Sequence, residues 1–240
     1  MDPVTSAAGG YAIDKLIGVG EGLVRKYVIE PWTRKRAVEF YRKFCEALLA
    51  KNAEAAELEE LLDKLLSDEA RAQVVFDAYR SVCLSKSKII GPRIIAVLVA
   101  GIIQRDGIAS ETEELLLAAA EQLSDAELLA FLAELKKHPQ PNKLGITEIT
   151  MDECHVDSNQ PSGQLNLSAG SLTHRFGLWA ERLRSLGFIS ESVHEDTFQY
   201  EADFERHVDM SGSVRVISWK IRFHDPSMRL ADLIEQVSAV

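Results

Sequence analysis

The sequence predicts a mainly α-helical protein with two domains, a helical N-terminal domain over residues 1–137 and a small α+β domain over residues 142–240. From about residue 11 to residue 137, apolar side chains recur at the spacing of one helix face. The segment 138–141, His-Pro-Gln-Pro, then stops helical structure and marks the domain boundary. Beyond it, two stretches that alternate apolar and polar residues predict a β-hairpin.

Four helices are expected before residue 90. The apolar stripe of the first, over 11–28, consists of Ile13, Leu16, Ile17, Gly20, Leu23, Val24, Tyr27 and Val28. Pro31 interrupts this pattern. The second stripe consists of Val38, Tyr41, Phe44, Cys45 and Leu48. Asn52 is placed to cap a third helix, and a fourth begins at about Asp68.

Start and stop signals define the next three helices. Pro92 suits the first turn of a fifth, very apolar helix, and Gly107 suits its end. Two short helices are expected to follow, because two capping boxes appear in which each side chain bonds the backbone of the other residue. The boxes pair Ser110 with Glu113 and Ser124 with Glu127.

The second domain begins with residues 142–169, which are rich in Ser, Asn, Gly and Thr and are expected to form a loop with one short strand or helix. Segment 171–186 has the spacing of an amphipathic helix, which Gly187 ends. The hairpin strands are expected over 198–208 and 213–224, with a last helix from Pro226. A helix followed by a hairpin is typical of a winged helix, so we expect a winged-helix-like domain.

Composition and charge exclude several classes of protein. The net charge of −10 argues against a generic nucleic-acid binder, which needs a basic surface. Three cysteines without a CxxC pair, and no secretory signal, predict a cytoplasmic protein without a disulfide framework. The longest apolar run, 94–103, is half of the roughly 20 residues that a membrane span needs, and is therefore expected to be a buried helix.

No motif assembles a catalytic site. The stretch 15–28, KLIGVGEGLVRKYV, resembles a kinase glycine-rich loop, but the lysine strand, catalytic loop and Asp-Phe-Gly that must accompany it are missing from the sequence. Tight helix packing around Gly20 explains the glycines better. Cys154 and His155 beside two carboxylates suggest a metal site only weakly, because no second spaced pair of ligands is present. We therefore expect a protein without an enzymatic activity, a cofactor or a bound metal.

Basic residues gather between residues 25 and 43, where seven Lys or Arg face two Glu. These candidates for partner binding are Arg25, Lys26, Arg34, Lys35, Arg36, Arg42 and Lys43. Such a run can contact an anionic membrane surface peripherally or a phosphate backbone. The alternative is an ordinary solvated helix face.

The charges of the second domain favour a protein partner over DNA. Arg175 and Arg182 lie on the expected helix and are further candidates for binding. The segment 191–205, however, holds six carboxylates and no Lys or Arg, which would repel a phosphate backbone. A DNA-binding regulator remains the alternative. Three aromatic residues of the first strand are expected to pack on Phe176 and Trp179; they are Phe198, Tyr200 and Phe204.

The order of these parts resembles the Abi-alpha family of bacterial abortive-infection proteins. The resemblance rests on a glycine-containing helix leading into VRKYVIEPWTRKRAVEFYRKF, on acidic helices with LSDAELLAFL, and on WAERLRSLGFI before a closing strand and helix. It implies a role in phage defence and carries over no catalytic residues. The sequence does not define the oligomeric state.

Overall fold

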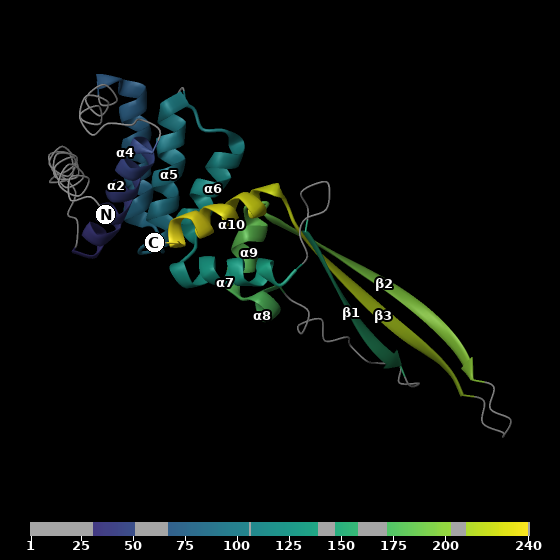
Figure 1. Cartoon of the computed structure of the whole chain (residues 1–240). Helices are drawn as coiled ribbons and strands as arrows, with labels where there is room; N and C mark the ends of the chain where they lie inside the picture. The colour runs from purple at the N-terminus through teal and green to yellow at the C-terminus, as the bar shows by residue number, and fades with distance from the viewer. Residues whose placement is uncertain are drawn as a thin grey trace. The chain divides into compact units, whose positions relative to one another are not determined.

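The protein is mainly helical, with one three-stranded antiparallel sheet near the C-terminus (Figure 1). The computed structural model describes residues 31–50, 67–105, 107–138, 147–157, 172–202 and 210–239. The expected helices over 11–28 and from Asn52 lie outside these residues. Two compact units are present: Met1–Leu132 with Leu230–Val240, and Ala133–Arg229. This division falls a few residues before the boundary expected at 138–141 and assigns most of the last helix to the first unit.

The first unit is a helical bundle around α5 (Ile90–Arg105), which contacts α2, α4 and α6. These helices are α2 (Pro31–Leu49), α4 (Glu69–Leu84) and α6 (Glu111–Gln122), followed by α7 (Asp125–Lys136). Eleven residues of α5 are buried, and they include most of the apolar run 94–103. The prediction that this run is a buried helix is therefore confirmed. None of the described helices is long and apolar enough to cross a membrane.

The two predicted capping boxes and the predicted start of a helix at about Asp68 are confirmed. The Ser110 side chain accepts from the Glu113 backbone N–H, and Glu113 Oε2 accepts from the Ser110 backbone N–H. Ser124 and Glu127 exchange the same two bonds. Asp68 caps α4 through a bond from the Arg71 backbone N–H. One apolar stripe needs correction: Val38 is 37% exposed, and Phe40 occupies the core of α2 in its place.

The second unit holds the sheet and two short helices. In chain order these elements are β1 (Thr147–Asp157), α8 (Leu172–Phe176), α9 (Leu178–Ser185), β2 (Ile189–Ala202) and β3 (Met210–Phe223). The sheet order is β1-β3-β2, with all pairs antiparallel. Phe223 of the central strand pairs with Thr147 on one side and Ile189 on the other. The last helix, α10 (Asp225–Ser238), follows β3 directly.

Two sequence predictions for this unit were incomplete. The hairpin is present, but β2 begins at Ile189 rather than at residue 198, and the segment expected to be mostly loop contains the eleven-residue strand β1. The single helix expected over 171–186 is two helices separated by Gly177. Its φ of 94° lies in the left-handed region that favours glycine, so the chain turns there.

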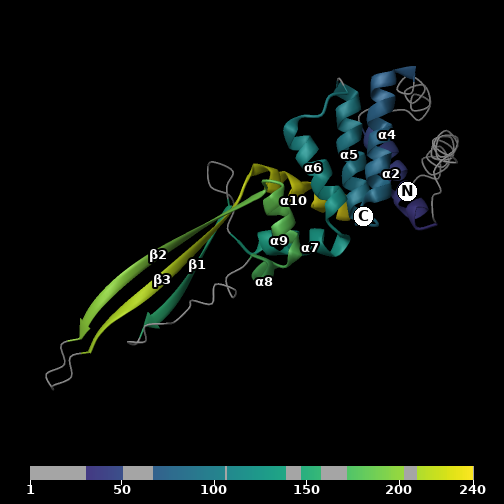
Figure 2. The ribbon, with the colours of Figure 1, turned by 180° about the vertical axis from the view of Figure 1, so that it is seen from behind.

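The core of the second unit lies at the end of the sheet where β2 begins. Phe188 there donates its backbone N–H to the Leu183 carbonyl, and its own carbonyl accepts from the Ser227 hydroxyl at 2.7 Å. The buried residues here are Leu172, Trp179, Leu183, Phe188, Ile189, Trp219, Ile221 and Phe223. In both views the strands continue well beyond α8 and α9 (Figures 1 and 2).

Candidate interaction surfaces

The basic residues expected on α2 do not form one exposed face. Arg34 and Lys35 are exposed. Arg42 is ion-paired with Glu39 at 2.6 Å, and Lys43 with Glu46 at 3.0 Å. Arg25 and Lys26 lie outside the described residues.

Arg36 is a buried structural residue. Only 7% of it is exposed, and its Nε donates to the Ser87 carbonyl at 2.9 Å. Since Ser87 lies 51 residues further along the chain, this bond ties α2 to the loop before α5. Arg36 therefore cannot contribute to an exposed basic surface, because its guanidinium is buried in the first unit and hydrogen-bonded there.

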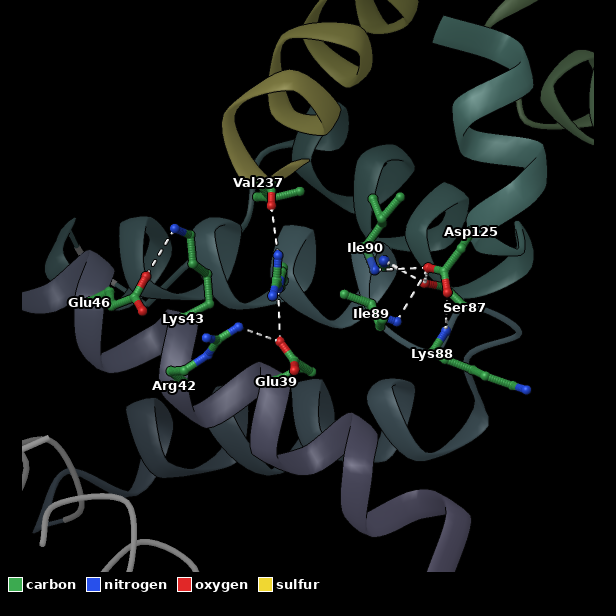
Figure 3. Close-up of polar contacts among 12 residues, drawn as sticks. Glu39, Arg42, Lys43, Glu46, Ser87, Lys88, Ile89, Ile90, Asp125 and Val237 are labelled. Carbon is green, nitrogen blue, oxygen red and sulfur yellow. Dashed lines mark hydrogen bonds and ion pairs between the residues drawn. The ribbon is translucent and has the colours of Figure 1, made fainter. Parts of the chain in front are cut away.

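Asp125 forms hydrogen bonds with the same loop before α5 (Figure 3). Its carboxylate accepts from the backbone N–H groups of Lys88 at 3.0 Å and Ile90 at 2.8 Å, and from the Ser87 hydroxyl. Partial burial alone would raise the pKa of Asp125, but these hydrogen bonds outweigh it and hold the pKa below its ordinary value. The first residue of α7 therefore caps the start of α5.

A second polar cluster joins α2, α5 and α10 in the first unit (Figure 3). Arg93 donates from Nε to Glu39 at 2.8 Å and from Nη1 to the Val237 carbonyl at 3.0 Å. Burial alone would raise the pKa of Glu39, but hydrogen bonds from Arg93 and Arg42 outweigh it and lower the pKa. Both clusters are internal, and sequence analysis missed them because their members are far apart in the chain.

Cys45 and Cys83 are not suited to nucleophilic chemistry. Cys45 is 3% exposed, and burial raises its pKa to about 11, so the reactive thiolate is scarce at neutral pH. Burial also raises the pKa of Cys83. Both thiols lie near Tyr41, whose ring stacks on Tyr79 at 5.9 Å between centroids. The cluster is part of the packing between α2 and α4.

The arginines of the second unit differ in their surroundings. Arg175 on α8 is exposed and Arg182 on α9 is half-buried. A third, Arg184, is ion-paired with Glu181 at 2.9 Å and with Glu191 at the start of β2. The pairing with Glu181 can be read from the i,i+3 spacing, but the pairing with Glu191 requires β2 to begin at residue 189.

Two sequence interpretations concern side chains that the structure does not describe. Phe198 and Tyr200 belong to β2, but their side chains lie outside the described part of the chain, so their packing on Phe176 and Trp179 stays a prediction. Phe204 lies outside the described residues. Cys154 and His155 are neighbours in β1, and their side chains also lie outside the described part of the chain. No group of three potential metal ligands occurs in the described part of the chain.

Comparison with known proteins gives no match: no family model, no curated protein and no solved structure matches this chain.

Proposed function

We propose that this chain is a non-enzymatic protein-interaction protein whose second unit binds a protein partner. The observation that carries the proposal is the charge arrangement where α9 meets β2. Arg184 is held by Glu181 and Glu191, so this cation is neutralised within the unit. Further carboxylates follow along β2, at Glu195, Asp196 and Glu201. A cation that is paired within the unit, next to a strand whose sequence is acidic, suits a protein partner better than a phosphate backbone.

The proposed biological setting is bacterial phage defence. It rests on the resemblance to the Abi-alpha family in the order of the sequence segments. This setting leads to a specific expectation. The partner should be captured under phage challenge, and its capture should depend on the charged residues of the second unit.

A charge-reversal experiment tests the interaction. The tagged full chain is purified from cells with and without phage challenge, as the wild type and as Glu191→Lys. Glu191→Lys breaks the ion pair with Arg184 and reverses the surface charge, so we expect at least a tenfold loss of the captured partner. Glu114→Lys, an exposed position on α6, is the matched control and should retain it. Equal capture by all three proteins would reject the proposed surface.

The alternative function is a winged-helix DNA-binding regulator. The succession of α9 and the β2–β3 hairpin favours it, together with the exposed Arg175 and half-buried Arg182. We expect the full chain not to shift duplex DNA at near-physiological salt. Nanomolar, sequence-specific binding that is lost in Arg175→Ala with Arg182→Ala would establish the regulator instead.

Peripheral contact with an anionic membrane is a separate candidate for the first unit, favoured by the exposed Arg34 and Lys35. Reversing both charges should abolish co-sedimentation with vesicles rich in phosphatidylserine, and that binding should weaken steeply with salt. Arg36 is left unchanged in this variant because its substitution would disturb the bundle. If the wild type does not co-sediment, the two residues are an ordinary solvated face.

A further inference from the structure

Strand β2 lies at an edge of the sheet in the second unit. The order β1-β3-β2 places β3 on one side of it, and no described strand pairs with it on the other side. The pairing with β3 runs without interruption from Ile189 to Ala202, so β2 has no β-bulge. An edge strand presents a row of backbone N–H and C=O groups that its own sheet does not use. The fourteen residues of β2 therefore form a long backbone edge.

The ladder between β2 and β3 shows which residues face this edge. The His224 backbone N–H donates to the Phe188 carbonyl at 2.9 Å, as in a hydrogen-bonded pair of an antiparallel ladder. Such pairs recur at every second residue, so the even-numbered residues of β2 bond to β3. The odd-numbered residues direct their backbone groups away from β3. From residue 191 onward these are Glu191, Val193, Glu195, Thr197, Gln199 and Glu201.

The second unit covers only the first residues of β2. Helix α9 packs against β2, and its Arg184 is ion-paired with Glu191. The next three residues, Ser192, Val193 and His194, are all exposed, Val193 by 55%. Since neighbouring side chains of a strand lie on opposite faces, both faces of β2 are accessible at this point. In both views β2 continues past α8 and α9 (Figures 1 and 2). We call the backbone edge over residues 193–202 the open edge.

The sequence of β2 lacks the residues that usually keep an edge strand from pairing. Natural edge strands are often protected by lysine, proline or a β-bulge. Residues 189–202 contain no Lys, Arg, Pro or Gly, and their four carboxylates are Glu191, Glu195, Asp196 and Glu201. These carboxylates repel an acidic strand and attract a basic one. The charge of β2 therefore specifies the chemistry of the strand that can be added.

We propose that the open edge binds an extended, basic segment of the protein partner, which joins the sheet as a further strand beside β2. In this mode of recognition, main-chain hydrogen bonds supply the affinity and side chains supply the specificity. Lysine or arginine in the added strand forms favourable cross-strand pairs with a strand that carries carboxylates. This inference rests on the proposed function, because it states how the partner of the second unit is bound.

A second copy of the chain fits the open edge less well. Pairing of two β2 strands would bring together two segments that each hold four carboxylates and no Lys or Arg. Like charges on adjacent strands are destabilising. The charge of β2 therefore favours a basic segment over self-association.

A peptide-binding experiment with the full chain tests the inference. The probe is a fluorescein-labelled decapeptide that alternates lysine and valine, and fluorescence anisotropy follows its binding. The wild type should bind it, with an affinity that falls as salt is added. The same peptide N-methylated at every amide keeps its charges but loses its N–H donors, so it should bind at least tenfold more weakly. The peptide with glutamate in place of lysine should not bind.

Two proline variants test which edge of the sheet is used. Thr197→Pro removes an N–H that faces the open edge and that β3 does not need, so the hairpin should persist while affinity for the lysine peptide falls at least tenfold. Thr150→Pro is the matched control on β1, the other edge among the described strands. Its N–H also faces away from β3, because the odd-numbered residues of β3 bond to β1. This variant should bind the peptide like the wild type, and both variants should retain the far-UV circular dichroism of the wild type.

Several results would overturn the inference. They are a wild type that does not bind the lysine peptide at about 1 mM, equal binding of the N-methylated peptide, and an affinity that Thr197→Pro leaves unchanged or that Thr150→Pro lowers more. Self-association in sedimentation that Thr197→Pro abolishes would overturn it too, because a second copy would then occupy the open edge.

The capture experiment separates this inference from the proposed function. Capture of a partner that Glu191→Lys abolishes and Thr197→Pro leaves intact would support the partner but overturn its binding as an added strand. Peptide binding with the expected loss in Thr197→Pro, but without any captured partner, would reject the proposed function and leave the open edge as a site for basic segments.

Discussion

Two glycines of α5 show how single atoms limit the packing of the first unit. A Cβ added at Gly91 would overlap the Ala120 carbonyl oxygen and lie 2.7 Å from Ser87 Cβ. A Cβ added at Gly101 would meet nothing within 4 Å. The same substitution therefore has opposite consequences at two positions of one helix.

We predict that Gly91→Ala destabilises the first unit by about 1–3 kcal/mol, because the backbone of α6 cannot yield without moving the helix. Gly101→Ala should be neutral or stabilising by up to about 1 kcal/mol, since alanine is the better helix former. Urea unfolding followed by far-UV circular dichroism measures both. A smaller loss of stability in Gly91→Ala than in Gly101→Ala would contradict the close approach of α5 and α6.

Asp125 gives a pH-dependent prediction. Its folded-state pKa is lowered, so its stabilisation is fully present above the unfolded value of about 3.9 and is lost as the pH falls through the folded value. Asp125→Ala should therefore cost about 1–2 kcal/mol at pH 7, typical of a lost helix cap, and much less at pH 3.

The control for that experiment is Asp232→Ala, an exposed position on α10. It should lie within about 0.5 kcal/mol of the wild type, as is usual for surface substitutions. An Asp125→Ala penalty that does not shrink between pH 7 and pH 3 would show that the carboxylate charge is not what stabilises the start of α5.

At the scale of elements, Arg93 decides how the end of α10 is attached to α2 and α5. Arg93→Lys keeps the charge but cannot reach Glu39 and the Val237 carbonyl with the same fork of donors. We predict at least threefold faster amide hydrogen exchange over residues 230–239, measured by mass spectrometry. Arg80→Lys, at an exposed position of α4, is the control and should leave that exchange unchanged.

A second outcome follows from the shared carboxylate. Because Arg93 binds Glu39, the variants Arg93→Lys and Glu39→Gln should be non-additive, with a coupling of about 0.5–2 kcal/mol in the double-mutant cycle. Strict additivity would mean that the ion pair contributes nothing to the attachment of α10.

At the scale of the whole molecule, a destabilising substitution in one unit should lower the unfolding midpoint of that unit more than the midpoint of the other. Trp179 and Trp219 are buried in the second unit, whereas most of the helix signal comes from the first. In a Trp32→Phe background, Gly91→Ala should lower the urea midpoint seen by circular dichroism more than the midpoint seen by tryptophan fluorescence. Equal shifts of both midpoints would show that the two units unfold as one cooperative body.

The sequence alone determined what depends on neighbours in the chain. Helix α5, the capping boxes at Ser110 and Ser124, the ends at Gly107 and Gly187 and the presence of a hairpin follow from periodicity, side chains three residues apart and glycine conformations. These are local effects, and they are readable because the interacting groups lie within a few residues of each other.

Only the tertiary structure decided what depends on residues far apart. Arg36 was expected among the basic residues available for binding. It is instead buried in the first unit, where it donates a hydrogen bond to the Ser87 carbonyl, 51 positions further along the chain. The residues of β1 were expected to be mostly loop. They form a strand because they pair with β3, which lies far along the chain, and their own sequence does not show that pairing. Such pairings are fixed by chain closure and burial, which a linear pattern does not record.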